Sequence, residues 1–453
     1  MGKYFGTDGF RGEANIDLKA EDAFRIGRFL GWYYKEMHPE RRCRIVIGKD
    51  TRRSSYMFED ALSSGITSSG ADVYLMHVTT TPSVAYIVRV DDFDCGIMIS
   101  ASHNPYYDNG IKVISGSGEK IDDETIDRIE EYLDGKIPEI PLARRDEIGR
   151  TVDYAAGRNR YIGYLISIAD RSFKGRDVAL DCSNGSASSI AKPVFDALGA
   201  HTHVMACEPN GTNINEGVGS THMEKLCEFV KKEGCDIGFA YDGDADRCLC
   251  VDEKGNVING DQIMYACGKL MKEKGELSDD MIVVTVMSNF GLFKALDREG
   301  IRYEKTKVGD RFVYECMSRE GYSLGGEQSG HIIFSKLATT GDGILTSLRM
   351  MEVLLERKCE ASKLVEECPM YPQCLKNVRV RSKQEAMDNE AVKKAVDAVA
   401  AKLSDSGRIL VRESGTEPVI RVMVEAPTEE SCESLVDEVI AVIEKEGLTE
   451  ADA

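Results

Sequence analysis

The sequence predicts an α/β fold of three related domains, followed by a smaller α+β module. The main observation is a repeat, in which an apolar strand, a polar turn, a helix, a glycine and a second strand follow one another three times. The repeats open at residues 44–50, 177–181 and 281–285. Because strands that alternate with helices are typical of parallel sheets, we expect three α/β domains with mixed, mostly parallel sheets.

Length and composition agree with several globular domains. The chain has 453 residues, of which 42% are hydrophobic, and a formal net charge of −20. This charge argues against a wide nucleic-acid or anionic-membrane surface and favours a soluble cytoplasmic protein. The 14 cysteines form no CxxC pair, which favours reduced, buried thiols. We expect no membrane segment and no hydrophobic leader, and both a monomer and a homodimer remain open.

The remaining elements follow from apolar runs, which favour buried strands, and from glycines, which end helices. The glycines that close the three repeat helices are Gly70, Gly199 and Gly300. The expected helices cover 20–36, 55–69, 189–198 and a segment that ends at Arg298. The further expected strands cover 72–76, 96–99, 237–241 and a segment from His201.

Prolines at 137–141 and 368–372 and a turn at 252–256 divide the chain. The predicted domains are 1–150, 151–253, 254–368 and 369–453. The last of these differs from the repeats. Its predicted order is a strand at 376–380, a helix at 385–403, strands at 408–412 and 420–425, and a helix at 428–444.

A candidate nucleophile follows the strand expected at 96–99. Ser102 lies in the run Ser100-Ala101-Ser102-His103-Asn104-Pro105, where the apolar strand ends and Pro105 prevents a continuing ladder. A turn then brings back Lys112, so a hydroxyl, an imidazole and an ammonium lie within eleven residues. On this loop alone, a polar turn between two strands explains the pattern equally well.

A candidate metal site follows the strand expected at 237–241. Asp242, Asp244 and Asp246 alternate on one tight loop that ends in Arg247. Three carboxylates this close repel one another unless a cation lies among them, and oxygen ligands suit Mg²⁺ or Mn²⁺. An EF-hand is excluded, because the sixth loop position is not glycine and no glutamate ends a twelve-residue loop. The alternative is a solvated acidic turn.

Three further loops combine small residues with charge. Residues 5–12 carry Arg11, which can pair with a phosphate, although a surface turn is the alternative. Residues 325–331 place Glu327 and Ser329 two positions apart, where both can reach sugar hydroxyls. Residues 412–418, with an arginine at 421 beyond them, suit a phosphate bound by backbone N–H groups and forked arginine contacts.

Taken together, these loops resemble the α-D-phosphohexomutase superfamily over residues 4–447. The matching segments, in order, are SASHNP at 100–105, DGDADR at 242–247, GEQSGH at 326–331 and RESGTEP at 412–418. Gln328 points to the branch that acts on amino-sugar phosphates, because relatives acting on glucose and mannose phosphates usually carry another residue there. Ala245, which replaces a frequent glycine, is also common in that second branch, so glucose and mannose phosphates remain the alternative substrates.

The resemblance implies four domains around a central cleft, the last one similar to TATA-binding protein. It implies an intramolecular phosphotransferase that interconverts glucosamine 6-phosphate and glucosamine 1-phosphate and supplies amino-sugar nucleotide and cell-wall precursors. The reaction would pass through a phosphoserine enzyme and a hexose 1,6-bisphosphate, which also serves as activator. One Mg²⁺ per chain would be held by Asp242, Asp244, Asp246 and the phosphate on Ser102.

The resemblance also assigns roles to individual residues. The implied catalytic residues are Ser102, as phosphoserine, His103, Lys112 and Arg247. The implied substrate-binding residues are Thr7, Arg11, Lys307, Asp310, Glu327, Ser329 and His331. The implied phosphate-binding residues are Arg412, Ser414, Gly415, Thr416 and Arg421.

Charge supports this interpretation independently. Three aspartates, one Mg²⁺ and a phosphoserine dianion sum to roughly −3, so cations are needed nearby. Arg11, Lys112 and Arg247 lie on loops that can supply them. Two alternatives fit the sequence less well. A hydrolase with Asp242 as nucleophile leaves the loops at 100–105 and 412–418 unexplained. A sugar-phosphate sensor without catalytic activity does not need every reactive group intact.

Overall fold

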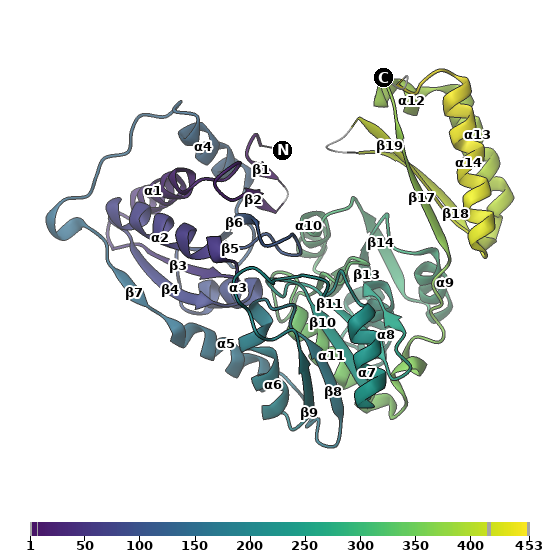
Figure 1. The fold of residues 1–453 in the computed structure, drawn as a ribbon, viewed down its shortest axis with the longest axis horizontal. Helices are drawn as coiled ribbons and strands as arrows, with labels where there is room; N and C mark the ends of the chain where they lie inside the picture. Colours follow the sequence, from purple (N-terminus) through teal and green to yellow (C-terminus); the bar gives the residue numbers. More distant parts are fainter. Residues whose placement is uncertain (1, 7, 415–417, 451–453) are drawn as a thin grey trace. The chain divides into compact units, whose positions relative to one another are not determined.

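The computed structural model describes residues 2–6, 8–414 and 418–450. The chain forms two compact units, the first made of Met1–Met287 and Glu299–Glu367 and the second of Ser288–Arg298 and Cys368–Ala453. In the part of the chain that the structure describes, three β-sheets lie in the first unit and one in the second (Figure 1). The prediction of three α/β sheets followed by an α+β module is thereby confirmed. In the described ranges, no helix is long and apolar enough to cross a membrane.

The first sheet combines a parallel part with an antiparallel part. Its strand order is β1-β2-β6-β5-β3-β4-β7. From β5 through β3 and β4 to β7 the neighbours are parallel, whereas β6, β2 and β1 continue the sheet antiparallel. The strands are β1 Phe5–Gly6, β2 Gly9–Glu13, β3 Arg44–Lys49, β4 Asp72–Val78, β5 Cys95–Ile99, β6 Asp108–Ser115 and β7 Thr151–Asp153.

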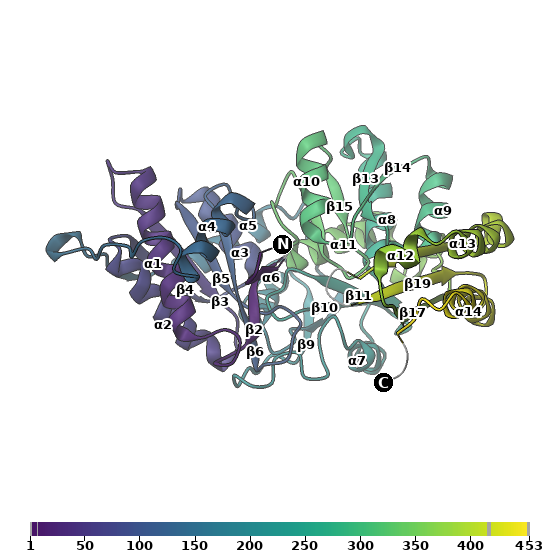
Figure 2. The ribbon, with the colours of Figure 1, turned by 90° about the horizontal axis from the view of Figure 1, so that it is seen from above.

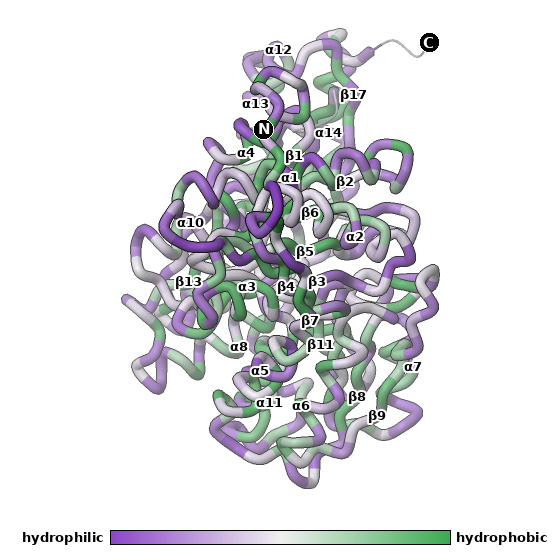
Figure 3. Tube along the Cα trace, turned by 90° about the vertical axis from the view of Figure 1, so that its left-hand side faces the viewer, coloured by the Kyte–Doolittle hydropathy of each residue, from purple (hydrophilic) through white to green (hydrophobic). Residues whose placement is uncertain are grey.

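Helices cover both faces of this sheet because successive strand residues point to opposite sides. Ile45 and Ile47 of β3 pack in a core with α1 and α2, whereas Val46 packs with α3 on the other face. Figure 2 shows α1 and α2 on one side of β3 and β4 and α3 on the other, and Figure 3 shows hydrophobic stretches along these strands. The helices are α1 Ala20–Met37, α2 Arg53–Ser68, α3 Thr81–Val90 and α4 Asp123–Leu133.

The second and third sheets have the same mixed character. Their strand orders are β12-β11-β10-β8-β9 and β14-β13-β15-β16, with parallel pairs at one end and antiparallel pairs at the other. The strands of the second sheet are β8 Asp177–Asp181, β9 His201–Met205, β10 Ile237–Tyr241, β11 Cys248–Asp252 and β12 Val257–Ile258. Those of the third are β13 Met281–Thr285, β14 Arg302–Thr306, β15 Leu324–Gly326 and β16 Ile332–Phe334.

The helices around these two sheets complete the first unit. α7 packs its apolar side on the second sheet, and α10 packs on the third. β7 and β12 extend the first and second sheets a few residues past 150 and 253. The helices are α5 Ala155–Ser167, α6 Ala191–Ala197, α7 Glu224–Glu233, α8 Gly260–Glu273, α10 Asp310–Glu320 and α11 Gly343–Arg357.

The three predicted repeats are present as strand, helix and parallel strand. They are β3-α2-β4, β8-α6-β9 and β13-α9-β14, where α9 is Phe290–Glu299. The glycine after each helix has a positive φ, +96° at Gly70, +91° at Gly199 and +62° at Gly300. Glycine reaches this left-handed region without steric cost, which is why it ends each helix at a sharp turn.

The second unit is an antiparallel sheet of order β17-β19-β18, with helices packed on one of its faces. The predicted single helix at 385–403 is wrong, because Asn389 interrupts it. The Asn389 side chain accepts hydrogen bonds from the N–H groups of Ala391 and Val392 and so starts a new helix. The elements are β17 Gln373–Arg379, α12 Lys383–Asp388, α13 Glu390–Leu403, β18 Arg408–Glu413, β19 Val419–Glu425 and α14 Glu429–Lys445.

The segment before and within α9 is fastened to the C-terminal part of this unit. The Asn289 side chain donates to the Tyr371 carbonyl at 3.0 Å, and the Phe290 N–H donates to Glu425 Oε2 at 2.8 Å. Arg408 donates to the Ser288 carbonyl and pairs with Glu425, whose side chain is fully buried. These contacts explain why a segment from the middle of the chain belongs to the second unit.

Candidate active site

Ser102 lies directly beyond β5 in a strained backbone conformation. Its φ is +53°, its exposed fraction is 1%, and its N–H donates to Ser100 Oγ at 2.9 Å. The hydroxyl donates to Asp242 Oδ2 at 2.5 Å and lies 3.3 Å from His103 Nδ1. Non-glycine residues with a positive φ are uncommon and are found mainly at functional sites, which supports a functional role for Ser102.

Two side chains that were not among the predicted site residues fix this loop. The carbonyls of Ser102 and Asn104 both accept hydrogen bonds from Arg52, at 3.1 and 2.6 Å. The same carbonyls accept from Asn215 Nδ2, at 2.9 and 3.0 Å. Arg52 is itself fully buried and paired with Asp50. Arg52 could have been predicted from the polar residues that follow β3. No local sequence pattern predicts that Asn215 contacts this loop.

The three aspartates meet on the short loop between β10 and β11. Asp242, Asp244 and Asp246 have exposed fractions of 1%, 0% and 4%, and one carboxylate oxygen from each lies within 4.8 Å of the others. Among the described residues, Oδ1 of Asp244 and Oδ1 of Asp246 are buried without a hydrogen-bond partner. Because unpaired buried oxygens are costly, this cluster fits a cation with hard oxygen ligands.

Electrostatics within the cluster support the same conclusion. Burial and the carboxylates of Asp246 and Asp244 raise the pKa of Asp242 well above its ordinary value. The backbone N–H of Arg247 donates to the other Asp242 oxygen at 3.2 Å, and Thr81 Oγ1 donates to Asp244 at 2.5 Å. A divalent cation would relieve the remaining repulsion among the three carboxylates.

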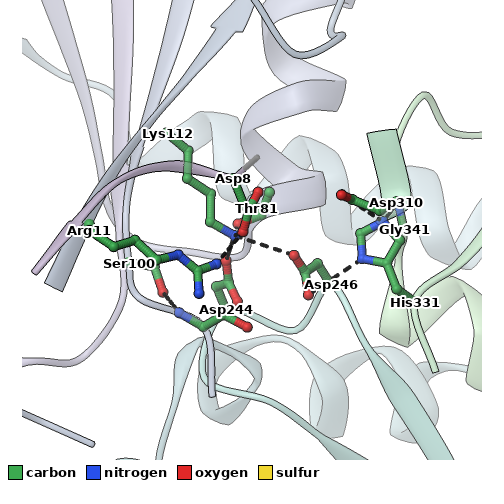
Figure 4. A network of polar contacts seen from close by, with 12 residues as sticks. Asp8, Arg11, Thr81, Ser100, Lys112, Asp244, Asp246, Asp310, His331 and Gly341 are labelled. Atoms are coloured by element: carbon green, nitrogen blue, oxygen red, sulfur yellow. Dashed lines mark hydrogen bonds and ion pairs between the residues drawn. The ribbon is translucent and has the colours of Figure 1, made fainter. Parts of the chain in front are cut away.

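Lys112 supplies the nearest positive charge to the aspartates. It lies on β6 opposite Met98 of β5, so the hairpin that presents the Ser102 loop also presents the lysine. Its Nζ is 2.8 Å from Asp244, 3.3 Å from Asp246 and 2.9 Å from Asp8 (Figure 4). Burial lowers the pKa of Lys112, but the three carboxylates outweigh it and raise the pKa well above its ordinary value.

His103 and Arg247 form a hydrogen-bonded pair beside Ser102. Arg247 donates to His103 Nδ1 at 3.2 Å. Burial, Arg247 and Arg11 lower the pKa of His103 to about 4, so its ring is neutral at neutral pH. A neutral imidazole beside the Ser102 hydroxyl can accept a proton, whereas the guanidinium of Arg247 can neutralise an anion.

The N-terminal loop contributes Asp8 in addition to the predicted Arg11. Asp8 pairs with Arg11, and it lies 2.9 Å from both Lys112 and Lys120. Gly9, at φ +91°, lets this loop approach β6, since a Cβ there would lie 2.5 Å from the Ile111 carbonyl oxygen. Thr7, another predicted residue, lies outside the described residues. Asp8 and Lys120 were not predicted as site residues, because their partners Lys112 and Asp310 lie far away in the sequence.

His331 and Asp310 reach the aspartates from the third sheet and α10. His331 Nδ1 lies 3.7 Å from Asp246 Oδ1, and its Nε2 accepts from the Gly341 N–H at 3.0 Å (Figure 4). Asp310, at the start of α10, lies 3.5 Å from His331 Nε2 and 2.7 Å from Lys120. A cavity of ≈ 410 Å³ lined by His331, Asp310 and Lys120 adjoins them, which is within the size range of small-ligand sites.

The other residues predicted to bind the substrate have different surroundings. Glu327 Oε1 accepts from the Gly309 N–H at 3.0 Å, which connects the 325–331 loop to the start of α10. Ser329 is exposed. Lys307 is also exposed, and its Nζ lies 5.9 Å from the ring centre of Phe312. In the described residues, neither of these two has a recorded contact with an aspartate of the cluster.

The second unit contains the predicted phosphate loop. Arg412 on β18 is paired directly with Arg421 on β19, and Arg421 lies 3.5 Å from Ser414 Oγ. Burial and Arg421 lower the pKa of Arg412. Like charges opposite each other across two strands are unfavourable, so this pair fits an anion. Gly415 and Thr416 lie outside the described residues.

Comparisons with known proteins cover nearly the whole chain. It matches the family models described as phosphoglucomutase/phosphomannomutase α/β/α domain I over residues 2–138, domain II over 159–255, domain III over 259–371 and C-terminal domain over 375–442. The chain is 64% identical over 447 residues to the phosphoglucosamine mutase of Lachnospira eligens, with 99% of each chain covered. The chain is 48% identical over 446 residues to the phosphoglucosamine mutase of Bacillus cereus, with 98% of this chain and 99% of the relative covered. The solved structure of a phosphoglucomutase/phosphomannomutase family protein from Burkholderia thailandensis aligns over 99% of each chain with a TM-score of 0.80 and 23% identity.

Proposed function

Since the chain belongs to the phosphoglucomutase/phosphomannomutase family of phosphohexomutases, we propose that it interconverts glucosamine 6-phosphate and glucosamine 1-phosphate. The full-length relatives at 64% and 48% identity, both phosphoglucosamine mutases, support this choice of substrate. The observation that carries the chemistry is the 2.5 Å hydrogen bond from Ser102 Oγ to Asp242, inside a buried cluster of three carboxylates.

Ser102 is the residue that carries the transferred phosphoryl group. In the first step the bond between Ser102 Oγ and phosphorus breaks, and a sugar hydroxyl of the monophosphate forms the new bond to phosphorus. The product is a hexose 1,6-bisphosphate. After this intermediate turns end for end, its other phosphoryl group passes to Ser102, which restores the phosphoserine and releases the isomeric monophosphate.

The hydroxyl proton has to leave as each new oxygen–phosphorus bond forms. His103 relays this proton between the sugar oxygen and Ser102 Oγ, which lies 3.3 Å from its Nδ1, so that Ser102 Oγ gains the proton in the first transfer and gives it up in the second. Lys112 and Arg247 neutralise the phosphoryl oxygens, since the ammonium of Lys112 lies 2.8 Å from Asp244 and the guanidinium of Arg247 lies 4.0 Å from Asp246. Phosphoryl transfer depends mainly on such positioning and charge neutralisation.

Magnesium is the proposed metal. Asp242, Asp244 and Asp246 would hold it together with the phosphate on Ser102, and two of their buried oxygens have no hydrogen-bond partner in the described residues. A bound Mg²⁺ supplies charge neutralisation and orientation of the phosphoryl oxygens. No other metal-dependent chemistry is needed for the reaction.

Two groups of residues bind the sugar phosphate. Arg11, Asp310, Glu327, Ser329 and His331 contact the sugar, and the predicted residues Thr7 and Lys307 complete this group. Arg412, Ser414, Gly415, Thr416 and Arg421 hold the phosphate that is not reacting. One arginine-rich loop serves both orientations of the bisphosphate, because either end presents the same dianion.

The test is a comparison of kcat/KM among sugar phosphates. Purified protein is assayed with Mg²⁺ and the matching 1,6-bisphosphate on glucosamine 6-phosphate, glucose 6-phosphate and mannose 6-phosphate. We expect glucosamine 6-phosphate to be preferred at least tenfold. Equal or higher kcat/KM on glucose or mannose phosphates would replace the proposal with the broader phosphoglucomutase/phosphomannomutase activity, and no turnover on any of them would refute mutase function.

A further inference from the structure

Three potential metal ligands meet at the edge of the second sheet, away from the candidate active site. Asp177 opens β8, and His201 and His203 lie two positions apart on the edge strand β9, so their side chains share one face. Asp177 is paired with His201 across the two parallel strands. His201 Nδ1 and His203 Nε2 lie 2.5 and 2.9 Å from the same oxygen, Oδ1 of Asp177.

This cluster is accessible, but its backbone is fixed. The side chains of His201 and Asp177 are 74% and 44% exposed, whereas that of His203 is 18% exposed. The His201 N–H donates to the Arg176 carbonyl and the Asp236 N–H to the Asp177 carbonyl, both at 2.8 Å. An ion can therefore arrive from solvent while the strand pairing keeps the three ligands in register.

The three side chains also have the right chemistry for a transition metal. Two imidazoles and one carboxylate suit Zn²⁺, whereas Mg²⁺ prefers oxygen ligands alone. Zn²⁺ binds such ligands at about 2.1 Å, which places tetrahedral ligand atoms ~3.4 Å apart. The observed hydrogen-bond distances must therefore lengthen by less than about 1 Å, which side-chain rotation supplies.

A second carboxylate lies behind the more buried ring. The other nitrogen of His203, Nδ1, faces Glu233 Oε2 at 3.8 Å. Ligating histidines commonly turn their free nitrogen toward a carboxylate, which orients the ring. We propose that Asp177, His201 and His203 form a zinc-binding site, with the remaining coordination positions open to water.

This site is separate from the aspartate cluster of the proposed reaction. β8 and β10 are parallel, Asp177 lies at the amino end of β8, and Asp242 follows the carboxyl end of β10. Five strand residues span roughly 16 Å, so the two clusters lie at opposite ends of the sheet. The site should join β8 to β9 without taking part in phosphoryl transfer.

The test uses tag-free protein that has been stripped of metal and then saturated with Mg²⁺. Zinc is added while the ¹⁵N signals of the histidine rings are followed, and its affinity is measured by competition with a chromogenic chelator. We expect the rings of His201 and His203 to shift together as one equivalent binds, whereas the exposed His222 ring does not. Ring signals report this site even if zinc also enters the aspartate cluster.

Variants of the ligands provide the second part of the test. His201→Ala, His203→Ala and Asp177→Asn should each weaken this binding roughly tenfold or more, and His222→Ala should leave it unchanged. Zinc should raise the melting temperature of the unaltered protein but not that of His201→Ala. Unchanged kcat for the three ligand variants would show that they are folded. The proposal is overturned if the two rings do not respond to zinc, or if His201→Ala binds it with undiminished affinity.

Discussion

The side-chain amide of Asn215 donates to the carbonyl oxygen of Ser102 at 2.9 Å, across 113 positions of sequence. The same amide donates to the Asn104 carbonyl, so one side chain from the second sheet's loops holds both ends of the Ser102–Asn104 turn. The direction of the Ser102 hydroxyl therefore depends on a contact between loops of two different sheets.

Replacing Asn215 should lower kcat strongly and the free energy of unfolding only slightly. In Asn215→Ala the two carbonyls keep their bonds to Arg52, so the fold should lose only about 1–3 kcal/mol of unfolding free energy. We expect kcat to fall roughly 10- to 100-fold because the hydroxyl is no longer held in place. Asn213→Ala, which alters a turn with Glu208 and Asn210, is the control. An unchanged kcat in Asn215→Ala would show that Arg52 alone positions the loop.

Removing the Ser102 hydroxyl should abolish the phosphoenzyme. Ser102→Ala loses the only atom that can carry the phosphoryl group in the proposed reaction, so turnover should fall by at least about 1,000-fold. Its unfolding free energy should change by about 1 kcal/mol or less, since one buried hydrogen bond is lost. Peptide mapping should find phosphate on Ser102 and not on the exposed control Ser117. Activity retained in Ser102→Ala would refute the assignment.

Removal of the metal should stop turnover reversibly. Excess chelator should eliminate activity, and added Mg²⁺ should restore it, because the three buried carboxylates need a hard cation. Asp244→Asn removes one anionic ligand and a partner of Lys112, so it should reduce kcat by several orders of magnitude at any Mg²⁺ concentration. Asp279→Asn, at an exposed position, is the matched control. Full activity in chelator would rule out this role of the cluster.

Arg421 should contribute to binding of the sugar phosphate and not to phosphorylation of Ser102. Arg421→Ala removes one of the two opposed guanidiniums, so we expect KM to rise roughly 10- to 100-fold and more free 1,6-bisphosphate to be released during turnover. The level of phosphoserine should stay the same. Arg381→Ala is the control, as an exposed arginine of the same unit. A lower kcat with unchanged KM would contradict a purely binding role.

Cys207 should be the most reactive of the four partly exposed thiols. The neighbouring Cys182 thiol lowers the pKa of Cys207 to about 6, although burial opposes this. Burial raises the pKa of Cys227, Cys359 and Cys374. Because the thiolate is the reactive form, alkylation of Cys207 should increase between pH 5 and pH 7 and then level off, with a midpoint near 6.

Timed alkylation followed by peptide mapping checks this prediction. Cys182→Ala should move the midpoint to higher pH, because the neighbouring thiol is removed, whereas Cys227→Ala should not move it. A midpoint for Cys207 above pH 8 would show that the thiolate is not stabilised.

The sequence was most informative where function depends on local pattern. The strands at 237–241 and 281–285 were predicted with their observed bounds, since each is a continuous apolar run between polar turns. The aspartates at 242, 244 and 246 were recognisable because a short alternation on one loop already brings the carboxylates together. Ser102 and Lys112 were within one hairpin and could be found in the same way.

The residues that were missed act over long sequence distances. Asp8, Lys120 and Asn215 act through contacts 100 or more positions away, and Arg52 acts through contacts 50 positions away. Lys120 pairs with Asp310, 190 positions further along the chain, and with Asp8, 112 positions before it. The division of the helix at Asn389 was missed for a different reason. Apolar periodicity continues across the break, and only the capping geometry of the asparagine ends one helix and starts the next.

The fastening of residues 288–298 to the C-terminal sheet has a consequence for synthesis on the ribosome. The acceptors at Tyr371 and Glu425 are translated roughly 80 and 135 residues after Asn289 and Phe290. During this interval α9 lacks the partners that hold its first turn, while β13 and β14 on either side of it can already pair. A nascent chain stalled before residue 425 should therefore remain sensitive to proteases at 288–298, and a premature stop near 368 should expose this segment to degradation even though three sheets are complete.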